Sequence, residues 1–256
     1  MDATNNSLSS DTDRRFGGLS RLYGDQGAQA IRQAHVAVVG VGGVGSWAVE
    51  CLARSGVGQL TLIDMDHVSE SNINRQLHAV TDTLGQSKVL AMQARIADIN
   101  PECLVHTVDE FITAENCQDL LSDRFDAVID ACDQVSAKVA MAAWAMAHRV
   151  RLVTVGAAGG KMQAHLVDMA DLAQATHDPL LAQVRQRLRK HHGAPAGGAS
   201  FGIQSVFSKE RVLMPEKSSQ ASRDSSLNCH GYGSVVTVTA TFGNCAAGWV
   251  LNQLAA

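Results

Sequence analysis

The stretch VAVVGVGGVGSWAVECLARSGVGQLTLIDMD, residues Val36 to Asp66, decides the fold of this chain. It begins with β-branched and small apolar residues up to Val39, which is typical of a parallel strand covered on both faces. A second apolar run, Leu60 to Ile63, follows a helical segment. The order strand, glycine turn, helix, strand predicts a β-α-β unit that binds a nucleotide.

The glycine turn has the spacing G-x-G-x-x-G, with glycines at Gly40, Gly42, Gly43 and Gly45. Because glycine lacks a side chain, backbone amides at the start of the next helix can approach a phosphate closely. Asp64 lies about 20 residues further on, where a carboxylate can accept a hydrogen bond from a ribose. The turn alone leaves dehydrogenases, methyltransferases and purely structural turns open.

Composition and length narrow the class of protein. The chain has 256 residues, of which 46% are hydrophobic and 18% charged, as in an ordinary soluble globular domain with a buried core. A formal net charge of -4 gives no global attraction to nucleic acid, so such a partner needs a local basic patch. The six cysteines form no C-x-x-C pair and no secretory signal opens the chain. We therefore expect a reduced, cytoplasmic protein without a structural zinc site.

Predicted strands and helices alternate beyond this unit. The further strands are Leu104–Val108, Ala127–Asp133 and Leu152–Val155, and the further helices are Thr83–Asn100, Asn116–Ser122, Lys138–Ala147 and Pro179–Lys190. This alternation predicts an α/β fold of the Rossmann-like, doubly wound type, with a mainly parallel sheet, helices on both faces and an irregular C-terminal extension.

The chain outside the alternating region differs in composition. Polar residues 1–13 predict a disordered tail, and residues 14–256 a single domain with its core at 30–160. Residues 190–230 predict a mobile insertion. Residues 231–256 carry no charge and predict an apolar C-terminal helix. A buried helix or a subunit interface is favoured over membrane contact, because threonines and asparagines interrupt the apolar run.

Smaller features within these segments leave alternatives open. Val206–Ser208 and Arg211–Met214 predict a short hairpin, and Glu216–Ser226 a polar linker. The cations of the helix at Pro179–Lys190 suit either a solvated face or a nucleic-acid contact. They are Arg185, Arg187, Arg189 and Lys190.

Polar side chains follow the ends of several predicted strands. They are Asp64, Asn72, Arg75, Lys88 and Asp133. Because the carboxyl ends of parallel strands open onto one crevice, these side chains are expected to converge. Two cations match a triphosphate, and Asp133, with Asp130, suits Mg²⁺. Each residue also has an ordinary explanation, such as a helix cap or a surface lysine, but together they predict an ATP site.

These motifs resemble those of the ubiquitin-activating enzyme superfamily, which includes the adenylyltransferases of molybdopterin and thiamine biosynthesis. The segments concerned are Gly40–Gly45, Asp64–Asp66, Asn72–Gln76, Gly85–Lys88 and Asp130–Asp133. Nearly the whole chain is also similar to the tRNA threonylcarbamoyladenosine dehydratases. That similarity rests on Arg15–Gly18, Arg21–Gly24, Gly156–Gly160, Asp178–Leu180 and Val236–Gly243. The chain departs from the family pattern at Gln163–His165 and at Gly193–Asn228.

The resemblance implies a single adenylyltransferase-type domain that dehydrates threonylcarbamoyladenosine in tRNA through an acyl-adenylate, with release of AMP and pyrophosphate. It implies catalytic roles for Arg75, Lys88 and Asp133, with Mg²⁺ on Asp133, and a contact by Arg15 from the partner subunit of a homodimer. The implied ATP-binding residues are Gly40, Gly42, Gly43, Gly45, Asp64, Asp66, Asn72, Arg75, Gln76, Lys88 and Asp130.

Other functions and partners stay open at this point. One alternative is adenylation of the C-terminal glycine of a ubiquitin-like sulfur-carrier protein, although relatives of that kind commonly carry a four-cysteine zinc clamp that this chain lacks. Two further alternatives are a nicotinamide oxidoreductase and a non-catalytic scaffold that binds a nucleotide. The resemblance also admits a cysteine desulfurase or a sulfur acceptor as a protein partner, and Cys229 as a catalytic thiol, although a spectator cysteine is favoured.

Overall fold

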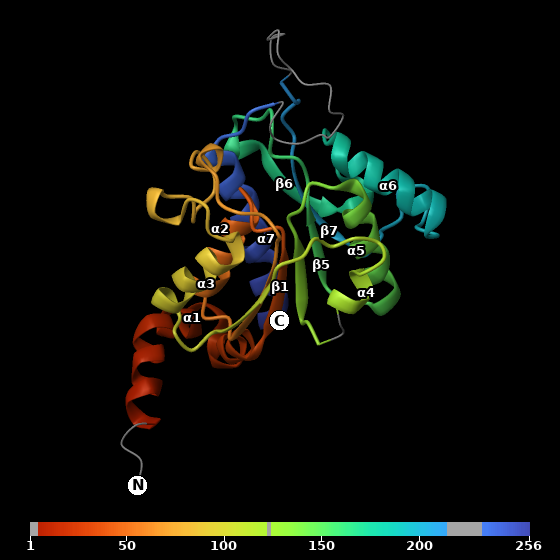
Figure 1. The fold of residues 1–256 in the computed structure, drawn as a ribbon. Helices are drawn as coiled ribbons and strands as arrows, with labels where there is room; N and C mark the ends of the chain where they lie inside the picture. Colours follow the sequence, from red (N-terminus) through yellow and green to blue (C-terminus); the bar gives the residue numbers. More distant parts are fainter. Residues whose placement is uncertain (1–4, 122–123, 214–231) are drawn as a thin grey trace.

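A computed structural model of the protein describes residues 5–121, 124–213 and 232–256 (Figure 1). Within this part a seven-stranded sheet has the order β3-β2-β1-β4-β5-β7-β6. The strands are β1 (His35–Val39), β2 (Gln59–Ile63), β3 (Leu104–Val108), β4 (Ala127–Asp130), β5 (Leu152–Val155), β6 (Val167–Asp171) and β7 (Gln204–Ser208). All neighbours pair in parallel except β6 and β7. The predicted doubly wound, mainly parallel sheet is confirmed.

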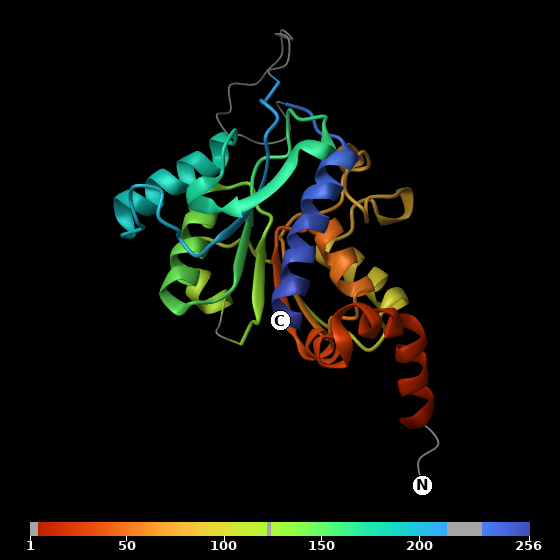
Figure 2. The same cartoon turned by 180° about the vertical axis from the view of Figure 1, so that it is seen from behind.

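Helices cover both faces of the sheet (Figures 1 and 2). One face carries α1 (Asn5–Gln33), α2 (Gly45–Arg54), α3 (Lys88–Ile99) and α7 (Val236–Ala255), and the other α4 (Cys117–Leu120), α5 (Val135–His148) and α6 (Pro179–His191). Short 3-10 helices lie at Glu70–Asn72, Thr81–Thr83, Ala164–Leu166 and Leu172–Gln174.

The sequence of β1 does not alternate between apolar and polar residues, because both faces of this strand are buried. Val36 and Val38 belong to the core under α2 and α7, whereas Ala37 and Val39 belong to the core under α5. Successive side chains of a strand point to opposite faces, so a central strand covered on both sides needs apolar residues at every position. All five residues of β1 are accordingly buried.

The strand order reverses at β1. The chain passes from β1 to β2 and β3 on one side, and then crosses to β4 on the other side of β1. In open α/β sheets, the crevice at the carboxyl ends of the two strands flanking such a reversal is where ligands bind. The fold therefore directs the search for a site to the loops that follow β1 and β4.

The N-terminal segment differs from the expected tail. Helix α1 begins at Asn5, so it includes most of residues 1–13. Two contacts tie this part of the helix down: Thr12 Oγ1 donates to Glu102 Oε1 at 2.6 Å, and Asp13 lies 3.9 Å from the guanidinium of Arg32. Polar composition alone did not reveal partners so distant in sequence.

The segment expected as an insertion contributes a strand to the sheet. β7 lies between β5 and β6, with Val206 and Phe207 buried. The antiparallel partner of β7 is β6, and residues 211–213 form no strand, so the predicted hairpin with Arg211–Met214 is wrong in its described part; Met214 lies outside the described residues. The predicted linker Glu216–Ser226 and Cys229 lie outside the described residues.

The uncharged C-terminal segment forms α7, which packs against α2 and the sheet and buries Phe242 and Val250 completely. Among the described residues, no helix is long and apolar enough to cross a bilayer. The close approach of α7 to α2 depends on Gly243, where an added Cβ would overlap the carbonyl oxygen of Val44 and lie 2.9 Å from the amide nitrogen of Ala48.

Two glycines of α7 allow a matched test of this packing. Gly243→Ala is expected to destabilise the fold by about 1–3 kcal/mol, because overpacking forces the two helices apart. Gly248 faces open space, so Gly248→Ala is expected to be neutral or to stabilise by up to about 1 kcal/mol through helix propensity. Urea unfolding midpoints measure both, and equal effects of the two changes would contradict the packing argument.

Candidate functional site

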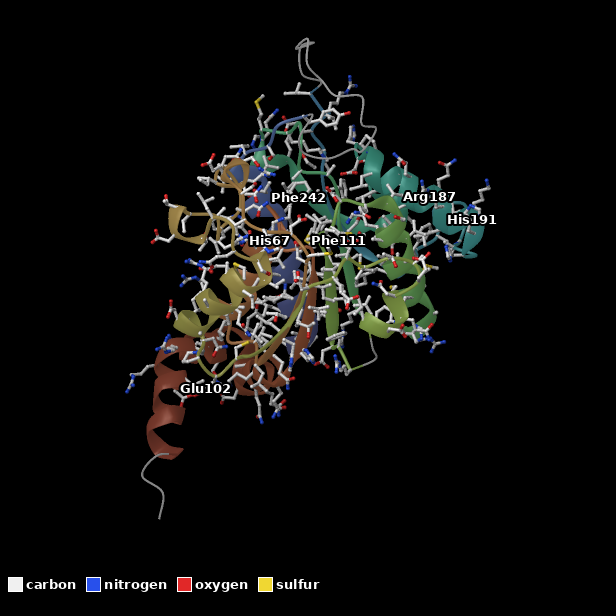
Figure 3. All side chains as sticks on the ribbon, viewed as in Figure 1. His67, Glu102, Phe111, Arg187, His191 and Phe242 are labelled. Atoms are coloured by element: carbon white, nitrogen blue, oxygen red, sulfur yellow. The ribbon has the colours of Figure 1, made fainter. Side chains whose placement is uncertain are left out.

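A cavity of about 450 Å³ lies at the carboxyl ends of the central strands, a size suited to a small ligand. Its walls come from the loops that follow β1, β2, β3, β4 and β5. The predicted site residues among its lining are Gly40, Gly42, Gly43, Asp64, Asp66, Asn72, Arg75, Gln76, Lys88 and Asp133. Two further lining residues, His67 and Phe111, are labelled in Figure 3. The convergence expected from the sequence is present.

The glycines of the first turn serve two different purposes. Gly40 has φ +83°, and a Cβ there would lie 2.9 Å from the carbonyl carbon of Ala131. A Cβ on Gly45 would overlap the carbonyl oxygen of Gly40, and Gly45 itself does not line the cavity. Gly42 and Gly43 do line it. Backbone packing therefore requires the outer two glycines, whereas the inner two keep the cavity wall free of side chains.

Asp64 joins the ends of β1 and β2. Its Oδ2 accepts the amide of Val41 at 2.6 Å and its Oδ1 accepts the amide of Asp66 at 2.8 Å. Burial raises the pKa of this carboxyl, while the charge of Lys88 and the two amide donors act in the opposite direction. The carboxylate thus fixes the glycine loop from within the cavity wall.

Lys88 begins α3 and is 5% exposed. A cation at the first turn of a helix is opposed by the helix dipole. Its Nζ donates to Asp66 Oδ2 at 2.6 Å, which offsets that cost and holds the ammonium at the cavity edge. Gly85, with φ +80°, precedes the helix, so α3 starts at Lys88 and not at Thr83 as the sequence pattern suggested.

The loop after β2 brings three more predicted residues to the cavity. Asn72 Oδ1 accepts the amide of Ser69 at 3.1 Å, while Arg75 Nη1 donates to the carbonyl of Ser71 at 2.7 Å. Gln76 Oε1 is buried without a hydrogen-bond partner in the described part of the chain. A buried acceptor that lines a cavity fits a ligand that carries a hydrogen-bond donor.

The two carboxylates after β4 have different environments. Asp133 is exposed and lines the cavity. Asp130 is fully buried and does not line it: its Oδ2 accepts Lys138 Nζ at 3.0 Å and Thr154 Oγ1 at 2.6 Å, and its Oδ1 accepts Cys132 Sγ at 2.9 Å. The structure thus corrects the expectation that Asp130 contacts the nucleotide, since groups beneath the cavity already occupy its oxygens.

Lys138 is the buried partner of Asp130. Burial opposes its charge, but the neighbouring carboxylate outweighs this and raises the pKa of Lys138. Both side chains have no exposed surface. Through its bonds to Cys132, Asp130 connects the pair to the segment Ala131–Asp133, which forms one cavity wall.

The second glycine turn is held by Asp178. Its Oδ2 accepts the amide of Ala157 at 2.8 Å and its Oδ1 the amide of Leu181 at 3.0 Å, so one carboxylate caps α6 and anchors the cavity wall. The fully buried Nζ of Lys161 lies 3.6 Å from Oδ2. Burial lowers the pKa of Lys161, while Asp178 opposes the shift.

Sequence reasoning missed part of the lining. The missed residues include His67, Glu110, Phe111, Ile112, Pro179, Leu180 and Thr239. Glu110 to Ile112 follow β3, so their position after a strand was an available signal. The ring of Phe111, 43% exposed, is an apolar surface at the cavity on which a nucleobase can stack.

Arg15 does not line the cavity. Its Nη1 donates to the carbonyls of Asp98 and Ile99, at the C-terminal end of α3, at 3.3 and 3.1 Å. Lys88 at the other end of this helix lines the cavity, and a helix of this length spans about 18 Å. The predicted contact of Arg15 with a partner subunit stays a prediction.

The described cysteines form no disulfide bond, and their thiol pKa values are raised. Burial raises the pKa of Cys51, Cys132 and Cys245, and raises that of Cys103 to about 12 and of Cys117 to about 11. A thiol with a raised pKa is a poor nucleophile at neutral pH. Within the same residues, no group of three His, Cys, Asp or Glu side chains could hold a metal ion by itself.

Comparison with known proteins identifies the family. The model of the ThiF family matches residues 17–255. The chain belongs to the ThiF family. Its ThiF-family relatives include the tRNA threonylcarbamoyladenosine dehydratases of Haemophilus influenzae, 43% identical over 94% of both chains, and of Escherichia coli, 41% identical over 95% of this chain and 94% of the relative.

Solved structures of ThiF-family members agree with this chain in fold, and some of them contain a nucleotide. The E. coli tRNA N6-threonylcarbamoyladenosine dehydratase in complex with ATP is 42% identical, covers 94% of each chain and has a TM-score of 0.86. The same protein in complex with AMP has a TM-score of 0.85 with the same coverage and identity. A ThiF-family fold of this kind therefore holds adenine nucleotides.

The buried pair beneath the cavity can be tested by stability. Lys138→Met leaves the Asp130 carboxylate buried without its cation and is expected to destabilise the fold by about 3–5 kcal/mol. Arg54→Met removes a partner of Glu50 that is 59% exposed and is expected to cost no more than about 1 kcal/mol. Thermal unfolding followed by calorimetry compares the two. Similar small losses would show that Asp130 finds another partner.

His78 predicts a pH dependence. Both ring nitrogens are buried without partners in the described part of the chain, and burial, with the nearby charge of Lys88, lowers the pKa of His78 to about 4. The unfolded chain binds a proton near pH 6.5, so stability falls as the pH drops from about 6.5 towards 4, by up to about 3 kcal/mol. His78→Leu should flatten urea-unfolding free energies over this range, and an unchanged slope would contradict the buried neutral imidazole.

Proposed function

We propose that this chain is an ATP-dependent tRNA threonylcarbamoyladenosine dehydratase. The observation that carries the proposal is the gathering of a phosphate-binding glycine loop, two cations and a free carboxylate around one cavity. The cations are Arg75 and Lys88, and the carboxylate is Asp133. The comparisons add weight, because relatives with this name are 41–43% identical over 94–95% of the chain. The proposal includes a cytoplasmic location, where the tRNA substrate is available.

The proposed reaction has two steps. A carboxylate oxygen of the threonyl side chain attacks the α-phosphorus of ATP, and the bond to the β-phosphate oxygen breaks, so pyrophosphate leaves and an acyl-adenylate forms. The carbamoyl group of the same side chain then attacks the acyl carbon, loses a proton and displaces AMP. The oxygen of the lost water leaves with AMP. A tethered nucleophile gains the rate advantage of an intramolecular reaction, so the enzyme needs no nucleophile of its own.

The cavity residues have roles that match these steps. Gly42 and Gly43 line the cavity just before α2 begins, a position from which their amides can bind a phosphate. Arg75 and Lys88 supply positive charge as negative charge accumulates on the leaving pyrophosphate. Asp64, at the end of β2, keeps lone pairs for a ribose hydroxyl after its two amide bonds.

Asp133 fits a magnesium ion bound together with the nucleotide. Mg²⁺ is usually held by one or two carboxylates plus phosphate oxygens and water, so the exposed carboxylate of Asp133 at the cavity is a suitable protein ligand. When bound there, the ion would neutralise charge on the phosphates. Asp130 is not proposed as a second ligand, because its oxygens bind Lys138, Thr154 and Cys132.

The proposal includes a homodimer in which Arg15 of one subunit reaches the nucleotide of the other. Its support is the resemblance to the superfamily and the position of Arg15 at the far end of α3 in its own protomer. The sulfur-carrier alternative is not adopted, and the proposed reaction contains no step that needs a sulfur-transfer partner.

Substitution of the cavity charges tests the proposal. Lys88→Ala or Asp133→Ala should each lower pyrophosphate release with modified tRNA by about 10²–10³, the usual cost of losing one group that stabilises the transition state. Lys209→Ala is the matched control, because Lys209 pairs with Asp168 on the surface and does not line the cavity. Mass spectrometry of the tRNA nucleosides should detect the loss of one water.

Two outcomes would contradict the proposal. Full activity of both variants would exclude adenylation at this cavity. Pyrophosphate release that requires a ubiquitin-like carrier protein and ignores modified tRNA would point to the sulfur-carrier reaction instead.

A further inference from the structure

Helix α6 carries an unbalanced positive charge outside the cavity. Its sequence, PLLAQVRQRLRKH, has no carboxylate, and its cations lie in the last two turns. They are Arg185, Arg187, Arg189 and Lys190. The whole chain has a net charge of -4, so this helix is a local exception to the acidic surface.

The helix separates an apolar face from a cationic one. Leu181, Val184 and Leu188 are fully buried in the core that α6 shares with α5. Arg187 and His191 lie on α6 at the edge of the molecule in Figure 3, and both are exposed, as is Lys190. Residues three and four positions apart share a helix face, so Arg187, Lys190 and His191 form one strip.

Within the part of the chain that the structure describes, the charges of the strip have no carboxylate partner. Among the described residues, no ion pair involves Arg187 or Lys190. The two neighbouring arginines use backbone carbonyls: Arg185 Nη1 donates to Leu172 at 3.5 Å, and Arg189 Nε donates to Pro195 at 3.2 Å. Burial and the charge of Arg189 lower the pKa of Arg185, as expected for cations that repel one another. An anionic ligand would relieve this repulsion.

Helix α6 connects the strip to the cavity wall and so fixes the distance between them. Pro179 and Leu180, the first residues of α6, line the cavity. At a rise of about 1.5 Å per residue, Arg187 lies about 12 Å and Lys190 about 16 Å along the helix from Pro179. Phosphates along a nucleic-acid strand are about 3.4 Å apart in rise, so this distance corresponds to a few nucleotides.

We propose that Arg187, Lys190 and His191 on α6 bind backbone phosphates of the same RNA whose modified nucleoside enters the cavity. The inference rests on the proposed function. An acidic polypeptide could meet the same charges, but RNA is favoured because one polymer must supply both the nucleoside at the cavity and the anions at the strip. The strip contributes to RNA binding and takes no part in the chemical steps of the reaction.

The test compares two charge-neutralised variants. Arg187→Gln combined with Lys190→Gln removes two cations of the strip and leaves the backbone contacts of Arg185 and Arg189 intact. Arg149→Gln combined with Arg151→Gln removes two exposed cations at the other end of β5 from the cavity. Both double variants change the net charge equally, so a difference between them reports position.

Fluorescence anisotropy measures the affinity for modified tRNA without ATP at several salt concentrations. Each phosphate contact contributes about 0.7–0.9 to the slope of log affinity against log salt, so the strip variant should lower this slope by about 1.4–1.8 and the control should not. With ATP, KM for tRNA should rise several-fold while kcat at saturating tRNA stays constant, because only uniform binding is lost. Circular dichroism melts establish that both variants fold.

Distinct results overturn the inference or the proposed function. The inference is overturned if the strip variant keeps the wild-type slope of log affinity against log salt, or if its slope falls as much as that of the control variant. Loss of poly-glutamate binding with unchanged tRNA binding overturns it in favour of an acidic protein. A wild-type protein that binds tRNA through the strip but never removes water from the nucleoside overturns the proposed function and leaves the strip standing.

Discussion

The hydrogen bond from the Val41 amide to the buried carboxylate of Asp64 is the contact on which the site depends. It joins the loop after β1 to the end of β2, two segments separated by the whole of α2. Together with the backbone bond from the Gly40 amide to the Ile63 carbonyl at 2.8 Å, it holds the glycine turn against the end of β2. The same carboxylate therefore contributes to the fold and to the wall of the cavity.

Two further buried carboxylates repeat this arrangement around the cavity. Asp130 Oδ1 accepts the amide of Cys132 at 3.2 Å, and Asp178 Oδ2 accepts that of Ala157. Each also faces a buried lysine, Lys138 or Lys161. A buried ion pair contributes little net stability because both charges lose their hydration, but removing one partner is costly. We infer that these pairs fix the geometry of the loops around the cavity.

The cavity combines a fixed backbone with exposed side chains. The glycine loops are held by buried carboxylates, whereas Asp133 and the ring of Phe111 are exposed to the ligand. The raised pKa values of Cys132 and Cys117 mean that neither described thiol is an activated nucleophile. The chemistry that suits such a site is one in which the substrate supplies the nucleophile and the protein supplies positive charge and position.

The sequence by itself determined the β-α-β unit and most of the cavity. The doubly apolar run of β1, the glycine spacing and the carboxylate at Asp64 are local patterns, and parallel strands bring their carboxyl ends together whatever the details of packing. Asp133, Lys88 and Arg75 were accordingly predictable as neighbours. Nothing beyond strand order was needed for that conclusion.

Only the tertiary structure decided the rest. Asp130 and Asp133 look equivalent in the sequence, but Lys138 and Thr154 lie against one of them and not the other. The sequence of β7 suggested a strand that pairs with the segment directly after it. Its partners are instead β5 and β6, which are separated from it along the chain. Such contacts form between segments distant in sequence, and their energies depend on burial and on the identity of the neighbour, which no local pattern contains.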